Sequence, residues 1–426
     1  MSGEEEATPP PNGTAIAPAP AVRPPLSRNV RMLATVSFFT DVASEMIYPL
    51  LPLFLSTVIG TSAAALGVIE GMAESVSSLL RLPAGWYSDR IRKRKPLVLF
   101  GYLIAAVSRP LVGLAQATGQ VLAIRLTDRF GKGVRTAPRD ALIADSVLPS
   151  QRGYAYGVHR AADSLGAVAG PLIAWALLTY EWVELRELFL WAAVPGLISV
   201  LLVLLFVRES YVPVPVRHDA VNPMSGQGGA ARDPIPHPET PLGRPFWKYL
   251  LVLFVFTLGA STDAFLLLRA SQLGVPTAMI PILWAMLHVV KSSSTVIGGA
   301  LSDRLGRHPL ILGGWAVYAL VYLGFALATA PWHAWLLFVV YGLYFGATEG
   351  TEKAMVADLV PASRRGTAFG WFNAAMGLGA LPASVIFGVV WERVGPEAAF
   401  AMGAGVAAAA TLLFVLLVPR VARDAA

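Results

Sequence analysis

The sequence lacks cysteine altogether and is poor in charge. None of its 426 residues is a cysteine, which excludes a disulfide framework, an iron–sulfur cluster and a cysteine-based zinc site. Charged residues make up only 14%, whereas about a quarter is usual in soluble globular proteins. Hydrophobic residues reach 55% and the mean hydropathy is +0.59. This balance predicts an integral membrane protein.

Motifs for nucleotide, nucleophile or metal chemistry are missing as well. The sequence contains no phosphate-binding P-loop, no nucleophile motif and no cluster of metal ligands. We therefore expect no cofactor, no bound metal, no enzymatic activity and no nucleotide-driven pump. The formal net charge of +6 does not predict nucleic-acid binding, because Lys and Arg stand at the ends of apolar segments instead of on a polar domain.

Apolar stretches recur along the chain, and each is long enough to cross about 30 Å of hydrocarbon. We count twelve of them, at 32–57, 63–87, 96–116, 119–140, 152–178, 186–207, 246–271, 276–301, 309–329, 332–356, 366–391 and 396–419. Connections rich in Lys and Arg (RIRKRK, SQRG, RLGRH, SRRG) alternate with connections nearly free of both (STVIGTSA, ATG, SQLGVPT, ATAPWH). We therefore expect an all-α protein of twelve transmembrane helices with both termini in the cytoplasm.

Composition divides the chain into two helical halves. Residues 208–245 are rich in Pro, Gly and charge, which predicts a cytoplasmic linker. Residues 1–31 are acidic and then rich in Pro and Ala, without the features of a signal peptide, and predict a disordered cytoplasmic tail. The expected domains are six-helix bundles at 32–207 and 246–420, followed by a short tail at 421–426.

The two halves repeat each other's motifs. GWYSDRIRKRKPL at 85–97 matches GALSDRLGRHPL at 299–310, and ADSVLPSQRGYAYG at 144–157 matches ADLVPASRRGTAFG at 357–370. Both pairs are offset by about 213 residues and follow the second and fourth predicted helices of each half. Parallel duplication of a six-helix unit is a known construction of secondary transporters.

These motifs resemble the signature of the major facilitator superfamily, of prokaryotic type, and the resemblance covers residues 32–420. Its most specific element is a Gly followed by Ser-Asp-Arg and a basic cluster, with the motif residues Gly85, Asp89, Arg90, Gly299, Asp303 and Arg304. The resemblance implies two six-helix bundles and a cytoplasmic latch, in which the Asp meets a helix N-terminus and a nearby Arg in the outward-open state. An ordinary positive-inside loop explains the basic residues but not the duplicated motif.

A second family motif is only partly present. The family's antiporters carry a Gly-Pro motif on the fifth helix, and here the segment GAVAGPLIAW supplies Gly166, Gly170 and Pro171. The segment has Ala174 and Trp175 where a glycine pair would end the motif. Gly-x-x-x-Gly spacing also serves close helix packing alone, so efflux and plain packing both remain as interpretations.

The predicted helix 119–140 carries a stripe of charge. Its members fall within about a 120° arc of a helix and are Arg125, Asp128, Arg129, Lys132, Arg135 and Arg139. Each would cost roughly 2.5–3.5 kcal/mol if it faced lipid at mid-membrane. The stripe therefore faces protein or water, where it either forms structural ion pairs or lines a cavity.

Other predicted helices offer ionisable residues for such a cavity. The candidates for proton coupling are Asp41, Glu45, Glu70, Glu74 and Asp163. The candidates for substrate binding are Arg129, Lys132, Arg135, His159, Asp263, His288, Lys291 and Tyr344. Residues from both halves suit a site near the midplane between two bundles.

The sequence predicts a multi-pass secondary transporter of a prokaryotic plasma or inner membrane. Its expected partners are a small-molecule substrate, protons and the lipid bilayer, and we expect it to act as a monomer. Proton-coupled efflux by antiport is the first hypothesis, and proton-coupled uptake or exchange of an organic anion or metal chelate is the second. A membrane sensor or scaffold that transports nothing would use the same fold without a continuous polar path.

Overall fold

The computed structural model describes residues 26–91, 93–148, 151–209, 242–361 and 364–418, and every regular element in these ranges is helical. Most of the predicted N-terminal tail and linker, at 1–25 and 210–241, lies outside the described residues, as does the predicted C-terminal tail. The side chain of Asp303 lies outside them too.

The first half of the chain forms long helices separated by short breaks. Its elements are α1 (Arg28–Glu45), η1 (Tyr48–Leu50), α2 (Leu51–Leu53), η2 (Phe54–Ile59), α3 (Ala63–Ile91), α4 (Lys95–Leu111), η3 (Val112–Leu114), α5 (Thr118–Asp145), α6 (Arg152–Thr179), α7 (Leu185–Trp191) and α8 (Ala193–Phe206). Pro49 and Pro52 follow α1 closely and lack the backbone N–H that an α-helix needs. The predicted segment 32–57 is therefore a helix with an irregular second part.

The second half repeats this pattern. Its elements are α9 (Arg244–Gly259), α10 (Asp263–Gln272), η5 (Thr277–Met279), α11 (Ile280–Leu305), α12 (Arg307–Leu327), α13 (Pro331–Asp358), α14 (Arg365–Arg393) and α15 (Pro396–Leu417). The predicted segment 246–271 is interrupted between α9 and α10, where the Thr262 side chain caps the new helix by accepting from the N–H of Ala264.

Ten of the described helical segments are long and apolar enough to cross a membrane. The two predicted segments outside this group correspond to α5 and α13, which are each 28 residues long but carry polar and charged side chains along their length. Their length still exceeds the roughly 20 residues that a helix needs to cross the hydrocarbon.

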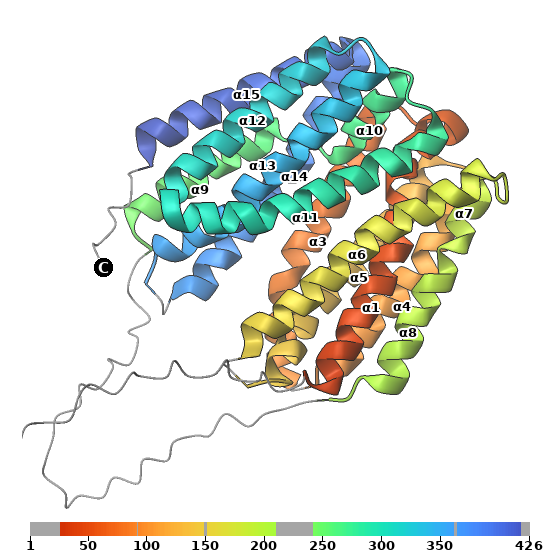
Figure 1. The fold of residues 1–426 in the computed structure, drawn as a ribbon, viewed down its shortest axis with the longest axis vertical. Coiled ribbons are helices and arrows are strands. Elements are labelled where there is room, and N and C mark those ends of the chain that lie inside the picture. The colour runs from red at the N-terminus through yellow and green to blue at the C-terminus, as the bar shows by residue number, and fades with distance from the viewer. Residues whose placement is uncertain (1–25, 92, 149–150, 210–241, 362–363, 419–426) are drawn as a thin grey trace, which may run out of the picture.

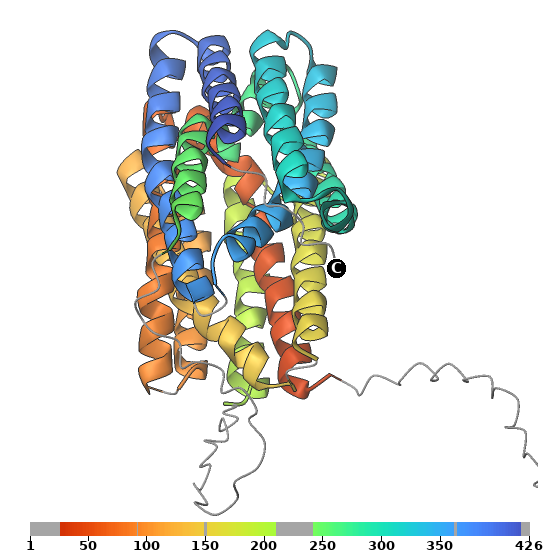
Figure 2. The same cartoon turned by 90° about the vertical axis from the view of Figure 1, so that its left-hand side faces the viewer.

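The helices gather by halves. In Figure 1, α1, α4, α5, α6 and α8 lie together, and α9, α12, α13 and α15 lie together beside them. Figure 2 shows the long helices running side by side along the same general direction. Between the halves, α3 packs along α14 and α6 packs along α11.

Helix backbones approach each other closely both between the halves and within the first half. Along α3 and α14 the Ser75 hydroxyl donates to the Gly377 carbonyl at 2.5 Å, and a side chain at Gly67 would collide with the backbone of Ser384. Within the first half, a side chain at Gly166 or Gly170 of α6 would collide with the backbone of α1. The partial Gly-Pro motif therefore packs two helices at close range, as small residues do in membranes.

Candidate functional site

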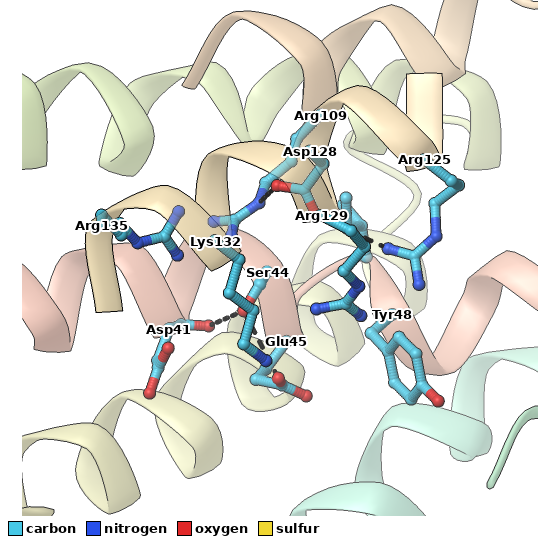
Figure 3. Close-up of a pocket in the computed structure, with 11 residues that line it drawn as sticks. Asp41, Ser44, Glu45, Tyr48, Arg109, Arg125, Asp128, Arg129, Lys132 and Arg135 are labelled. Atoms are coloured by element: carbon cyan, nitrogen blue, oxygen red, sulfur yellow. Dashed lines mark hydrogen bonds and ion pairs between the residues drawn. The ribbon is translucent and has the colours of Figure 1, made fainter. Parts of the chain in front are cut away.

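The charges of α5 point into the protein. Arg125, Asp128 and Arg135 expose no more than 5% of their surface, so they cannot face lipid. The other bases of the stripe are half-buried: Arg129, Lys132 and Arg139. Stripe residues and residues of α1 enclose a cavity of about 50 Å³, shown in Figure 3. The lining residues are Asp41, Ser44, Glu45, Ile47, Tyr48, Arg109, Arg125, Asp128, Arg129, Lys132 and Arg135.

Two of the lining bases belong to buried ion pairs. Arg125 forms a bidentate pair with Glu70 of α3, with Nε and Nη2 at 2.9 and 2.8 Å from the two carboxylate oxygens. Arg109 of α4 donates from Nε to Asp128 at 2.9 Å and from Nη1 to the Thr40 carbonyl at 2.9 Å. These contacts join α1, α3, α4 and α5, so Glu70 is tied to a structural pair instead of lying free in the cavity.

Arg129 and Lys132 of the stripe lack such partners. Among the described residues, Arg129 and Lys132 form no ion pair and no side-chain hydrogen bond, and the Nε of Arg129 is buried and unpaired. Arg135 donates to the Gly101 carbonyl at 3.3 Å and lies over the Tyr102 ring at 4.6 Å. Figure 3 shows Arg129 and Lys132 extending from α5 toward α1.

Glu45 connects the two halves of the chain. One of its carboxylate oxygens accepts a hydrogen bond from the Trp284 indole of α11 at 2.8 Å, and the His288 Nε2 lies 3.8 Å from the same oxygen. One helical turn away, Tyr48 stacks near Trp284 with ring centroids 5.3 Å apart, and its hydroxyl lies 3.5 Å from that of Thr262. We call the set Glu45, Tyr48, Thr262, Trp284 and His288 the junction.

A second contact between the halves lies nearer the start of α6. Arg160 of α6 forms an ion pair with Glu349 of α13. Lys291 of α11 reaches the other carboxylate oxygen of Glu349 at 3.4 Å and lies 4.0 Å over the Phe345 ring. Lys291 is thus paired, unlike Arg129 and Lys132.

The other acids of the first half occupy different settings. Asp41 lines the cavity within electrostatic range of Lys132. Glu74 accepts a hydrogen bond from Ser78 at 3.3 Å on the same helix and is exposed. Asp163 pairs with His159 one turn earlier on α6, with Nδ1 and Oδ2 3.6 Å apart. The structure therefore brings Asp41 and Glu45 into the cavity, while Asp163 pairs with His159 and lies within electrostatic range of Asp41.

The second half meets the site with aromatic rings. Asp263 accepts a hydrogen bond from the Tyr341 hydroxyl at 2.6 Å, and Tyr344 lies parallel to Tyr341 at 5.7 Å. The buried carboxylate of Glu352 accepts from the Trp315 indole at 2.8 Å. Asp263 and Glu352 are therefore held by tyrosine and tryptophan instead of by arginine.

The signature motifs form matching ion pairs at the ends of the helices. In the first copy Arg94 lies 2.8 Å from Asp145 and 3.4 Å from Asp89. At the equivalent positions of the second copy, Arg307 lies 3.4 Å from Asp358. The duplication seen in the sequence is therefore a duplication of contacts as well.

The predicted latch residues are mostly accessible. Asp89 exposes 71% of its side chain and, among the described residues, pairs with Arg94 and not with the N-terminus of α14. Arg90 lies over the Trp86 ring at 5.5 Å, and Gly85 faces Ala137 of α5. In the second copy, Gly299 faces open space and Arg304 is exposed.

Trp284 was absent from the residues predicted for the site. A tryptophan on an apolar helix is usually a packing residue, and the sequence gives no sign that its indole N–H meets a carboxylate from the other half. Its spacing of four residues from His288 is the one available signal, because residues four apart share a helix face.

Comparison with known proteins agrees with this architecture. The sequence pattern of the Major Facilitator Superfamily matches residues 33–352 of this chain. An uncharacterized MFS-type transporter, MJ1317 of Methanocaldococcus jannaschii, is 33% identical over 398 residues, which are 92% of this chain and 95% of that protein. The multidrug resistance protein MdtG of Enterobacter lignolyticus is 26% identical over 387 residues, 88% of each protein.

Solved structures show the same fold. A crystal structure of the nucleoside transporter NupG aligns with a TM-score of 0.70 at 14% identity, covering 91% of this chain and 98% of that one. Membrane-length helices, a duplicated signature motif and a charged cavity within the helices accompany this match. The chain is a multi-pass membrane transporter that belongs to the Major Facilitator Superfamily.

Proposed function

We propose that this protein is a secondary active transporter that moves a small molecule by alternating access and couples its movement to protons. The observation that carries the proposal is the position of Glu45, a carboxylate within a membrane-length helix that binds Trp284 of the other half. Protonation of Glu45 would change the strength of its hydrogen bond to Trp284. Because this bond joins the two halves, the protonation of Glu45 and the relative position of the halves would be coupled.

The proposal includes the topology. Twelve helices cross the membrane when α5 and α13 are counted with the ten apolar spans, and this even number puts both termini on the same side, which we assign to the cytoplasm. Residues 32–207 and 246–420 then form two six-helix bundles joined by a cytoplasmic linker at 208–245. A plasma or inner membrane of a prokaryotic cell is the proposed location. The alternation of basic and neutral connections supports this orientation.

The structure fits a state that is closed on the outer side. With this orientation, the junction and the hydrogen bond from the Ala64 N–H to Glu392 at 3.1 Å connect the halves toward the outside. On the cytoplasmic side Asp89 is largely exposed. In the outward-open state, Asp89 of the proposed latch would leave water and engage a helix N-terminus, which favours a carboxylate.

Protons are the proposed coupling ion because the cavity holds carboxylates without strong partners. Among the described residues, Asp41 forms no ion pair, and Glu45 has no base nearer than His288. Buried acids of this kind exchange protons more readily than acids in bidentate pairs with arginine. Glu70 is in the latter class and is therefore assigned to structure.

Efflux is the proposed direction, supported by similarity to a multidrug resistance protein over most of the chain. Uptake or exchange of an organic anion is the second candidate, favoured by the unpaired bases of α5. Efflux and uptake both move a compound across the membrane, whereas a sensor or scaffold built on this fold would move none.

Proteoliposomes containing the purified protein test the proposal. Fluorescent compounds of each charge class, namely naphthoate, naphthamide and N-methylquinolinium, are followed across the membrane with and without an imposed pH gradient. We expect gradient-driven movement of at least one class, lost in Glu45→Gln and retained in the control Glu181→Gln, which changes a carboxylate outside the cavity. Transport that is unaffected by the gradient would refute proton coupling, and no transport of any class beyond that of empty liposomes would count against the transporter assignment.

A further inference from the structure

We propose that the cavity between α1 and α5 binds the anionic group of a singly charged organic anion, such as a carboxylate or sulfonate. The inference rests on the proposed transport function and names its substrate class. It depends on which charges around the cavity are already neutralised and which are free.

The first step concerns the bases that have partners. Arg109 is matched by Asp128 at 2.9 Å and Arg125 by Glu70 at 2.8 Å, and all four residues expose 5% of their surface or less. These pairs are geometrically complete and buried, so they are unavailable to a ligand without breaking a structural contact.

The second step concerns the bases without partners. Arg129 and Lys132 line the cavity and form no ion pair with a described residue, and the Nε of Arg129 is buried without a hydrogen-bond acceptor. A buried donor that lacks an acceptor costs about 1–3 kcal/mol, more when it is charged. A ligand carboxylate would supply the missing acceptor and accept the charge-assisted bonds that guanidinium and ammonium groups form with anions.

The third step compares the free charges of the lining. Three bases remain after the buried pairs are set aside, namely Arg129, Lys132 and Arg135. Two acids remain, Asp41 and Glu45. Glu74 and Arg81, of opposite charge, lie within electrostatic range of Lys132 and of each other, and their charges offset each other. Three positive against two negative charges therefore leave one positive charge on the lining. One anionic group neutralises it, whereas a second anionic group would add an uncompensated charge in a poorly solvated site.

The size of the cavity points the same way. Its volume of about 50 Å³ is well below the roughly 300–1,000 Å³ of pockets that hold whole drug-sized ligands. In this closed arrangement the cavity accommodates a charged head group, and the body of the substrate would need the neighbouring helices to part. The anionic group is therefore the part of the substrate that the lining recognises in this arrangement.

Calorimetric titration of the full-length protein in detergent tests the assignment. The probes share one bicyclic body: naphthoate as the monoanion, naphthamide as its neutral isostere, naphthalene dicarboxylate as the dianion and N-methylquinolinium as the cation. Naphthalene sulfonate is included as a second monoanion. We expect the monoanions to bind at least about tenfold more tightly than the other probes, because losing a charge-assisted bond costs about 1.4 kcal/mol or more.

Variants locate the site. Arg129→Gln and Lys132→Gln should each weaken binding of the monoanions about tenfold, while naphthamide binding stays unchanged. The matched control is Arg139→Gln on the same helix, because Arg139 is paired with Asp140 at 2.9 Å and does not line the cavity. Arg129→Lys, which keeps the charge, should recover part of the affinity. Thermal unfolding of each variant shows whether it remains folded.

The outcomes separate this inference from the proposed function. Tighter binding of the cation or the dianion, or monoanion binding that both glutamine variants leave intact, would overturn the anion site even if the proteoliposomes transport a compound. Monoanion binding that depends on Arg129 and Lys132 would uphold the site even if no transport of it is found. Absence of binding by every probe would also overturn the assignment.

Discussion

The two halves of this protein share a duplicated scaffold but fill it with different chemistry. In the first half, arginines and carboxylates from α3, α4 and α5 form buried ion pairs around a cavity. In the second half, the corresponding interior is built of aromatic rings, as in the stack of Phe256 on Trp315 at 4.3 Å. One ion pair of the signature motif recurs at equivalent helix ends in both halves, so the interiors differ more than these ends do.

This contrast indicates that the two halves have different roles. Closely packed rings leave little room for rearrangement, so an aromatic half is suited to move as a body. A charged half with free bases and acids is suited to bind ligands and protons, since its unpaired groups can take them up without breaking a structural ion pair. The substitutions below test whether each half depends on its own chemistry.

The largest effect is expected from breaking a buried ion pair in the first half. Arg125→Gln leaves the Glu70 carboxylate buried and unpaired, which should lower the free energy of unfolding by about 3–5 kcal/mol. Thermal unfolding in detergent measures the loss. The double variant Arg125→Met with Glu70→Met removes both charges and should recover most of it. An Arg125→Gln protein as stable as wild type would show that the pair does not organise this half.

A smaller loss is expected in the second half. Trp315→Phe keeps an aromatic ring but removes the hydrogen bond to the buried Glu352 carboxylate, at a cost of about 1–3 kcal/mol. The control Trp371→Phe changes a half-exposed ring and should cost less. Equal effects in the two variants would mean that the second half depends on ring packing and not on the contact between Trp315 and Glu352.

A single added methyl group between α1 and α6 should lower the stability of the protein. Gly170→Ala places a Cβ against the backbone of α1 and should destabilise the protein by about 1–2 kcal/mol. Gly157→Ala on the same helix meets nothing within 4 Å and should be neutral or stabilising, because alanine favours helix more than glycine does. Thermal unfolding of the pair compares them directly, and equal stability would contradict the close approach.

The smallest effects are expected where the halves match. Arg94→Gln and Arg307→Gln remove equivalent ion pairs at partly exposed helix ends. Each should cost about 1 kcal/mol or less, because ion pairs at partly exposed helix ends contribute little to stability. A loss of several kcal/mol in either variant would show that these end contacts, and not the interiors, govern stability.

Much of the fold was predictable from the sequence. Hydrophobic length and the duplicated motifs predicted helical halves, and the arc of charge on 119–140 predicted a helix face turned away from lipid. The breaks after α1 and α9 were not predicted, although Pro49 and Pro52 were visible, because hydropathy averages over such interruptions. Ten helical segments are apolar enough to be recognised as spans where twelve were expected, since polar and charged residues lower the hydropathy of α5 and α13.

The pairing of side chains was less predictable. Sequence spacing placed Arg125 and Arg129 on one face, but it could not tell that the first would be paired and the second free. That outcome depends on the relative positions of α3 and α5, which tertiary packing sets. The meeting of Glu45 with Trp284 was invisible for the same reason, since 239 residues separate them in sequence.

The most direct test of the central claim, that the halves alternate about the junction, is a pair of distance measurements in lipid bilayers. The chain has no cysteine, so spin labels can be placed at will. One label pair at Ser62 and Gln272 spans the halves near the outer side, and another at Gly157 and Gly350 spans them near the cytoplasmic side. Alternating access predicts two distance populations for each pair, with the outer distance long when the inner is short, and Glu45→Gln should shift their balance. A single unchanging distance for both pairs, at every pH and with every ligand of the probe series, would contradict it.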